Sequence, residues 1–180
     1  MTLEPSPVFM GANVTDELRR RGIPMEAVKL AICTHPHGDH TDGVIQFADL
    51  LNWYFKKADP RILLPDERLR LTAIPTQHCE NSYAFLIEAE GKRILFTGDL
   101  CHPAVDFPQI AFETELDLLV CELAHFSPAD CVTAFDKTKA KRVLHTHIND
   151  NRWAAALHEQ LNKPHPYVYG AAFDGLELTL

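Results

Sequence analysis

Histidine and aspartate residues gather where apolar runs of this sequence end. They form one closely spaced group after the run at 28–33 and stand singly after later runs: His35, His37, Asp39, His40, His78, Asp99 and His147. Imidazole and carboxylate groups at the ends of core strands cost desolvation free energy unless something pairs with them. A divalent metal ion supplies that pairing, because imidazole suits zinc, iron and similar ions and a carboxylate can join two of them. The sequence therefore predicts a metal centre.

The strongest single signal is the spacing His-x-His-x-Asp-His at 35–40. Pro36 and Gly38 are expected to prevent regular structure there, so that the backbone is extended or looping. Such a backbone puts His35 and His37 on one side and Asp39 on the other. Two ions about 3.5–4 Å apart would then share one bridging oxygen from a carboxylate and one from water or hydroxide. A set of unrelated surface histidines in loops is the alternative interpretation.

The run THPHGDHTDG, together with His78, the TGD at 97–99 and the His at 147, resembles the metal-binding motifs of the metallo-β-lactamase-fold hydrolase superfamily. The resemblance covers roughly residues 11–180 and implies one α/β domain, an αβ/βα sandwich, over 1–180. It implies that one ion is held by His35, His37 and His78, the other by Asp39, His40 and His147, and both by Asp99. The family places the last ligand directly after a Thr, which favours His147 over His145.

This resemblance implies a hydrolase with a dinuclear centre and a metal-bound hydroxide. Zinc lowers the pKa of bound water from about 15.7 to about 7. Zinc is therefore the first expectation, and iron or manganese would also suit these ligands. Asp39 or Asp99 could move a proton to the leaving group. The expected substrate is a phosphodiester or another small ester; a thioester or lactone, or a metal-binding protein without catalysis, is the alternative.

A further histidine, His125, precedes Phe126 and Ser127 in a segment similar to the His-x-Ser/Thr element of ribonuclease Z and related phosphodiesterases. That similarity implies contact with the scissile group or assistance to the leaving group, which makes His125 a candidate catalytic residue. The alternative is that Ser127 caps a helix beginning at Pro128 and that His125 is an ordinary loop residue.

Periodicity and turn residues predict alternating helices and strands around these groups. Helices are expected at 15–21, 44–57, 128–137 and 152–161. Strands are expected at 28–33, 62–64, 68–74, 82–88, 92–97, 116–121 and 141–145, with YVYG and LELTL closing the sheet. The strands at 82–88 and 92–97 should form a hairpin, and the β-α-β order from 116 to 145 favours parallel pairing.

The part of the chain before His35 is shorter than the corresponding part of the superfamily that the motifs resemble. Residues 1–14 are expected to be a loose lead-in, so the N-terminal sheet should be cut back. A shortened sheet leaves an exposed edge and apolar face. A homo-oligomer would cover that face, and a truncated chain is the other explanation.

The amino-acid composition indicates which classes of binding partner are unfavourable. Among 180 residues, 17 are Lys or Arg and 25 are Asp or Glu, so the formal charge is −8. This acidity argues against general nucleic-acid binding and against anionic membranes. No apolar run is long enough for a membrane span. The five cysteines form no CxxC pair, which indicates free thiols and a cytoplasmic location.

Overall fold

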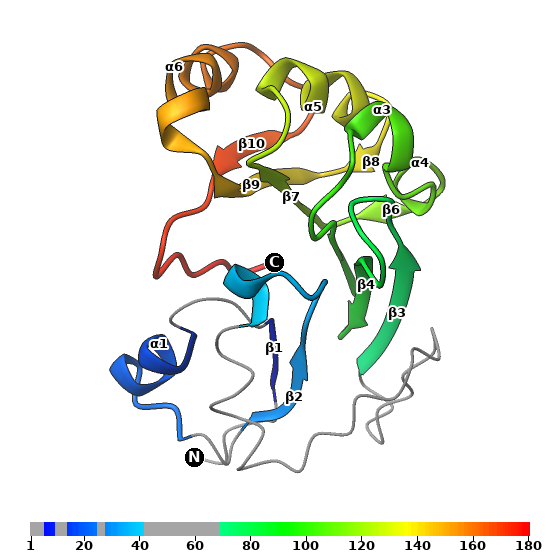
Figure 1. The fold of residues 1–180 in the computed structure, drawn as a ribbon. Helices are drawn as coiled ribbons and strands as arrows, with labels where there is room; N and C mark the ends of the chain where they lie inside the picture. The colour runs from blue at the N-terminus through cyan, green and yellow to red at the C-terminus, as the bar shows by residue number, and fades with distance from the viewer. Residues whose placement is uncertain (1–5, 10–13, 25–27, 42–68) are drawn as a thin grey trace. The chain divides into compact units, whose positions relative to one another are not determined.

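The computed structural model describes residues 6–9, 14–24, 28–41 and 69–180. Residues 1–59 form one compact unit and residues 60–180 form the other. Figure 1 shows that most helices and strands belong to the C-terminal unit. The expected helix at 44–57 and strand at 62–64 lie outside the described residues. The cut-back N-terminal sheet and the single domain over 1–180 stay predictions.

The N-terminal unit contains the predicted helix and strand that precede the His-rich segment. Helix α1 spans Val14–Arg20 and strand β2 spans Val28–Ile32. The helix carries acidic residues in its first turn and arginines in its last, which suits the helix dipole. It buries Thr15 and Leu18. Both sequence predictions are confirmed to within one residue at each end.

The expectation of a loose lead-in over 1–14 is wrong for Ser6–Phe9, which form strand β1. This strand pairs in parallel with β2, with Phe9 opposite Ile32. The register is irregular between Ser6 and Pro7, because proline has no N–H to donate to the ladder. The prolines of this segment are atypical of a strand, so the sequence did not indicate one. The strand is stabilised by its backbone pairing with β2.

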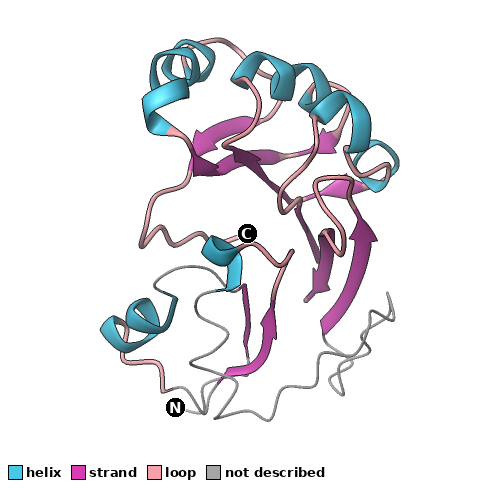
Figure 2. Cartoon of the chain, in the orientation of Figure 1, coloured by secondary structure: helices cyan, strands magenta, loops and turns pink. Residues whose placement is uncertain are grey.

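A mixed six-stranded sheet is the frame of the C-terminal unit (Figures 1 and 2). Its strands are β3 Leu69–Pro75, β4 Tyr83–Ala89, β5 Lys92–Phe96, β7 Leu118–Leu123, β9 Arg142–Ile148 and β10 Val168–Ala171. They lie in the order β10-β9-β7-β5-β4-β3. The pairs from β10 to β5 are parallel, and β5-β4 and β4-β3 are antiparallel. Strands β3, β5, β7 and β9 therefore run in the same direction, so their C-terminal ends share one edge.

The predicted connections of this sheet are confirmed. Strands β4 and β5 form the hairpin, and its turn residues Glu90 and Gly91 have φ values of 51° and 75°. Positive φ at both central positions is the backbone of a tight two-residue turn that matches strand twist. Helix α5, Pro128–Phe135, joins the parallel strands β7 and β9. The strand expected at 116–121 is divided into β6, Glu115–Leu116, and β7; β6 pairs with β8, Lys139–Ala140.

Helices cover one face of the six-stranded sheet (Figure 2). They are α3 Pro103–Asp106, α4 Ile110–Glu113, α5 and α6 Asp150–Leu161. The core between helices and sheet includes Phe135, Leu95 and Val143, each 0% exposed. Burial of such side chains provides the main driving force for folding the unit. Among the described residues, no helix has both the length and the apolar character needed to span a bilayer.

The C-terminal segment is partly as predicted. YVYG contributes β10, which pairs in parallel with β9. LELTL, in contrast, forms no strand. After β10 the chain turns at Gly175, with φ 91°, and Thr179 offers its carbonyl oxygen to the Arg142 side chain at 3.5 Å. A strand needs a ladder of backbone partners, and alternating apolar residues alone do not supply one.

Candidate metal centre

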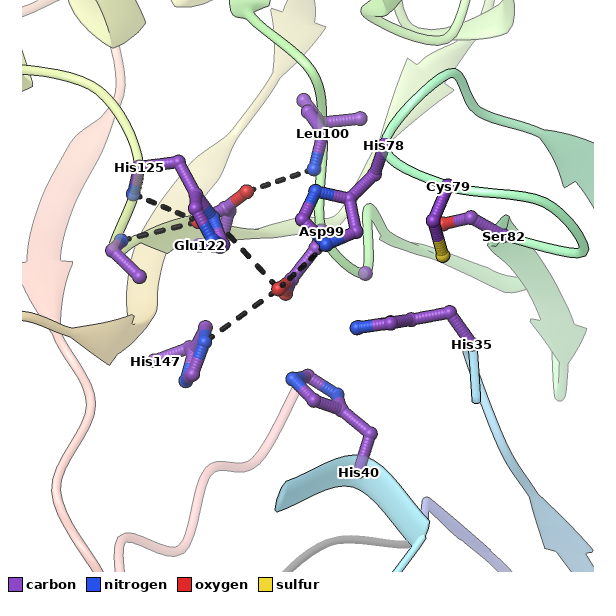
Figure 3. Close-up of polar contacts among 12 residues, drawn as sticks. His35, His40, His78, Cys79, Ser82, Asp99, Leu100, Glu122, His125 and His147 are labelled. Carbon is purple, nitrogen blue, oxygen red and sulfur yellow. Dashed lines mark hydrogen bonds and ion pairs between the residues drawn. The ribbon is translucent and has the colours of Figure 1, made fainter. Parts of the chain in front are cut away.

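Three imidazole rings of the C-terminal unit surround one buried carboxylate oxygen (Figure 3). The Oδ2 atom of Asp99 lies 3.7 Å from Nε2 of His78 and 3.6 Å from Nε2 of His147. It lies 3.8 Å from Nδ1 of His125. Asp99 itself is 2% exposed. The structure thus gathers three of the sequence-predicted histidines around one oxygen atom of Asp99, a fourth predicted site residue.

The separations from Oδ2 of Asp99 to Nε2 of His78 and Nε2 of His147 suit atoms that share a cation. They exceed the donor–acceptor distance of about 2.7–3.2 Å in a good hydrogen bond. Atoms that bind one zinc ion tetrahedrally at about 2.0–2.2 Å lie about 3.3–3.6 Å from one another. Ligand atoms of His78, Asp99 and His125 all fall within 4.8 Å of one another. The donor chemistry and the spacing in this unit therefore fit a divalent metal ion.

Sheet direction explains why these residues meet. His78 follows β3, Asp99 follows β5 and His125 follows β7, while His147 lies near the end of β9. The C-terminal ends of these codirectional strands form one edge of the sheet. The edge is the usual position of binding sites in sheets with parallel strands.

The two ends of the loop that carries His78 are joined by hydrogen bonds between Thr76 and Ser82. The backbone N–H of Thr76 donates to the carbonyl of Ser82 at 2.9 Å. The Thr76 hydroxyl lies 2.7 Å from Oγ of Ser82 and 3.2 Å from the carbonyl oxygen of Asp99. These buried contacts attach the His78 loop to the backbone of the residue that His78 faces.

Glu122 is the partner that orients His125. It is the last but one residue of β7 and is 1% exposed. Its Oε2 lies 2.6 Å from Nδ1 of His125 and accepts the N–H groups of Ala124 and His125 at 3.1 and 3.3 Å. Its Oε1 accepts the N–H of Leu100 at 2.8 Å. One buried carboxylate therefore joins the loop after β7 to the loop that carries Asp99.

The segment around His125 confirms the predicted helix cap, and the catalytic role of His125 stays a prediction. Ser127 caps α5 through a reciprocal pair of contacts with Asp130, as the helix-cap interpretation requires. His125 nevertheless faces Asp99. The Ser127 hydroxyl donates to the Asp130 carboxylate at 2.6 Å, so its contact is structural.

His147 lies inside β9, although the sequence placed it after the strand. The pairing of β9 with β7 shifts register there, since Glu122 is opposite Thr146 and Leu123 is opposite Ile148. His147 is the extra residue of this bulge and has a φ of 49°. Bulges re-aim side chains next to functional sites, and a left-handed conformation at a non-glycine residue is strained. The bulge turns His147 toward Asp99.

The neighbouring histidine, His145, points into the core. It is 0% exposed and its Nε2 lies 2.7 Å from the Tyr169 hydroxyl. Its Nδ1 lies 3.3 Å from the carbonyl oxygen of Cys121. Burial lowers the pKa of His145 to about 4, because the charged ring would lose its hydration. His145 is therefore a neutral core residue at physiological pH.

The N-terminal unit contains the second group of predicted ligands. The ring centroids of His35 and His37 are 4.6 Å apart, and those of His35 and His40 are 4.0 Å apart. The Oδ2 atom of Asp39 lies 3.5 Å from Nε2 of His40. His35 is 2% exposed. The four residues of the motif thus form one cluster of imidazole and carboxylate groups.

Thr34 orients two rings of this cluster. Its buried hydroxyl oxygen lies 3.1 Å from Nδ1 of His35 and 3.2 Å from Nδ1 of His40 (Figure 3 shows the two rings). A hydroxyl oxygen can accept from two N–H groups. When both rings donate through Nδ1, both Nε2 atoms carry lone pairs suited to a metal ion.

The expectation that residues 35–40 contain no regular structure is wrong at its end, because residues 38–41 form a helical turn. The carbonyl of His37 accepts the N–H of His40 at 3.1 Å and the Thr41 hydroxyl at 3.0 Å. Gly38 is at the start of this turn. The turn brings His40 back beside His35.

Sequence reasoning missed Thr34 and Glu122. Glu122 had a readable signal, because it is the one charged residue of the run LLVCEL. A charged side chain inside a core strand is costly to bury unless it is paired and hydrogen-bonded. Such a residue therefore indicates that other groups gather around it. Thr34 had no comparable signal beyond its place next to His35.

Comparison with known proteins identifies the fold. No protein-family model and no curated protein matches the chain. The metallo-β-lactamase fold protein YhfI from Bacillus subtilis matches with a TM-score of 0.77 and 18% identity, over 98% of this chain and 88% of that chain. The short form of human tRNase Z gives 0.65 and 16%, over 98% and 88%. A diphosphatase from the PhnP family gives 0.64 and 19%, over 97% and 79%.

The chain is therefore a metallo-β-lactamase-fold protein with an α/β architecture and mixed sheets. The resemblance stated from the motifs and the predicted fold class are confirmed. At these identities the likeness concerns the fold, and function must be argued from the site.

Proposed function

We propose that this protein is a metal-dependent hydrolase that acts on a phosphodiester or another small ester. The observation that carries the proposal is the buried Asp99 carboxylate with the imidazoles of His78, His125 and His147 around its Oδ2 atom. A carboxylate as buried as that of Asp99 is costly in free energy without a compensating cation. The assignment of seven ligands to two ions, made from the motif resemblance, remains part of this proposal.

In the proposed reaction, the metal ions and the side chains of the protein have different roles. Divalent ions bound here would polarise the substrate oxygen and supply a nucleophile from water at neutral pH. His78, Asp99 and His147 would hold an ion in the C-terminal unit, and the motif resemblance assigns the further ligands to residues 35–40. His125, oriented by Glu122, is the group we assign to hold and move a proton at the leaving group.

Two observations favour phosphate esters among the ester classes. The chain shares its fold with human tRNase Z and with a diphosphatase, whose names both refer to phosphate chemistry. In addition, His125 belongs to the segment that is similar to the His-x-Ser/Thr element of phosphodiesterases, and it lies beside Asp99, the carboxylate that we assign to the metal. The net charge of −8 disfavours a long polyanion and favours a small substrate. Thioesters and lactones are the competing substrates.

The test combines metal analysis with a substrate panel. The protein is loaded with zinc, manganese or iron, its metal content is measured, and bis-p-nitrophenyl phosphate, p-nitrophenyl acetate, a thioester and a lactone are assayed. Asp99→Ala and His78→Ala should abolish turnover and lower the metal content. His158→Ala, which changes an exposed histidine of α6, is the matched control and should behave as wild type. Metal binding without turnover of any ester would contradict the hydrolase proposal and indicate a non-catalytic metal-binding protein.

A further inference from the structure

We propose that Asp106 is a positioning residue that locks the His78 loop to the Asp99 loop and so sets the geometry of the metal ligands. The proposal rests on the proposed function, because it assigns Asp106 a role toward the same ligands. Asp106 acts through backbone N–H groups close to two of these ligands, His78 and Asp99.

The carboxylate of Asp106 accepts three backbone N–H groups from two loops. Its Oδ2 atom accepts from Gln77 at 2.7 Å and from Cys101 at 3.0 Å. Its Oδ1 atom accepts from His102 at 3.1 Å. Gln77 immediately precedes His78, and Cys101 follows Asp99 by two residues. A single oxygen atom therefore joins the backbones that carry His78 and Asp99.

The short helix α3 holds Asp106 in place for this task. The His102 side chain caps the helix by accepting the N–H of Ala104 at 3.1 Å. The N–H of Asp106 donates back to the carbonyl of His102 at 3.2 Å. The next residue, Phe107, is 8% exposed and belongs to the core. Both ends of the helix are fixed, so the carboxylate cannot move without the loop that it grips.

Together with Glu122, Asp106 saturates three successive amides after Asp99. The N–H of Leu100 donates to Glu122, and those of Cys101 and His102 donate to Asp106. Hydrogen bonds from backbone N–H groups to a carboxylate are charge-assisted and about twice as strong as neutral ones. The loop that carries Asp99 is therefore held by ionic acceptors on both sides.

Only a carboxylate can make this set of contacts. An asparagine of the same shape has one acceptor oxygen and one NH₂ donor. In either orientation of the amide, its NH₂ group would face at least one of the three backbone N–H donors. Asp106→Asn should therefore lose at least one of the three contacts, and also the charge that strengthens the others, while the volume of the side chain is unchanged. Loss of a group that orients metal ligands commonly lowers metal affinity by about 10–100-fold.

The experiment compares Asp106→Asn with Asp117→Asn in the full chain. Asp117 also accepts a backbone N–H, from Arg93 at 3.0 Å, and pairs with Lys141 at 2.9 Å. It stands just before β7, at the end opposite His125, and is the matched control. Cobalt(II) affinity is measured by its visible absorption, and histidine ring signals are measured by NMR in the metal-free protein.

We expect Asp106→Asn to lower cobalt affinity by at least about 10-fold and to shift the His78 ring signals and the amide signals of Gln77 and Cys101. Asp117→Asn should change neither, even if it lowers the melting temperature as much. Equal effects of both variants, or unchanged His78 signals in Asp106→Asn, would overturn the proposal. If the wild type binds no metal, the proposed function fails, and the signals of the metal-free proteins still decide whether Asp106 locks the two loops.

Discussion

The Nδ1 atom of His125 lies 2.6 Å from Oε2 of Glu122, a carboxylate that is 1% exposed. An ionised carboxylate only accepts hydrogen bonds, so this contact places a proton on Nδ1. The ring orientation and tautomer of His125 are thereby set by a residue that is itself held by Leu100. The same logic orients imidazole bases in other enzymes.

The first prediction concerns the leaving group. His125→Ala should lower kcat by about 10²–10⁴-fold for a phosphodiester with an alkyl leaving group, because general acid catalysis contributes about that much. The loss should be much smaller for a p-nitrophenyl ester, whose leaving group departs without a proton. Steady-state kinetics on the two substrates measures the difference. Glu122→Gln should show the same substrate dependence, and an equal loss on both substrates would exclude this role for His125.

A second prediction follows from the strained backbone at His147, where φ is 49°. This conformation costs a residue with a β-carbon about 1–2 kcal/mol. His147→Gly should therefore raise the free energy of unfolding of the metal-free protein by up to about 1 kcal/mol, once the greater freedom of glycine in the unfolded chain is subtracted. Its metal affinity should fall. Urea denaturation and metal titration check the two effects.

The control for His147 is His147→Ala, which removes the ring but keeps the β-carbon. It should lower metal affinity as the glycine variant does, without the gain in stability. If alanine and glycine stabilise the protein equally, the strain is not in the backbone.

The third prediction is a pH dependence of stability that comes from His145. Its pKa is about 4 in the folded protein, against 6.5 for the ordinary ring, because burial disfavours the charged form. The unfolded chain therefore binds the proton first as the pH falls. The stabilising contribution is complete above pH 6.5 and is lost as the pH falls toward 4, with a total on the order of 3 kcal/mol.

Urea denaturation at pH 7.5 and at intermediate acidic values measures this loss. His145→Gln, which can still contact Tyr169 and Cys121, should be less stable at neutral pH and should lose less stability on acidification. The difference between wild type and variant isolates His145 from the other titrating groups. A difference that is independent of pH would mean that His145 does not titrate on unfolding.

The fourth prediction concerns metal removal. A ligand that binds only the folded state stabilises it by about 2.7 kcal/mol at a concentration 100 times its Kd. Chelation should therefore lower the melting temperature of the loaded protein, and added zinc or manganese should restore it. Calorimetry with and without chelator measures the shift. Asp99→Ala should melt at the same temperature in both conditions; a shift in that variant as large as in wild type would place the metal elsewhere.

Much of the fold was readable from local sequence. The strand at 28–32 and the hairpin of β4 and β5 follow from apolar runs and a tight turn, both of which are local properties. The β7-α5-β9 unit follows from the order of its elements. Strand β1 and the absence of a strand at 176–180 were not readable, because a strand depends on a backbone partner that is distant in sequence.

The sequence by itself determined the chemical inventory of this protein: imidazoles and carboxylates at the ends of apolar runs, in the spacing of a known metal-binding motif. The tertiary structure decided which of these side chains lie close to one another. It brought His78, His125 and His147 around Asp99, turned His145 into the core, and supplied Glu122 and Asp106 as acceptors for the loops between. The physical reason is that residue type sets what a side chain can bind, whereas strand direction, register and burial set what lies within its reach.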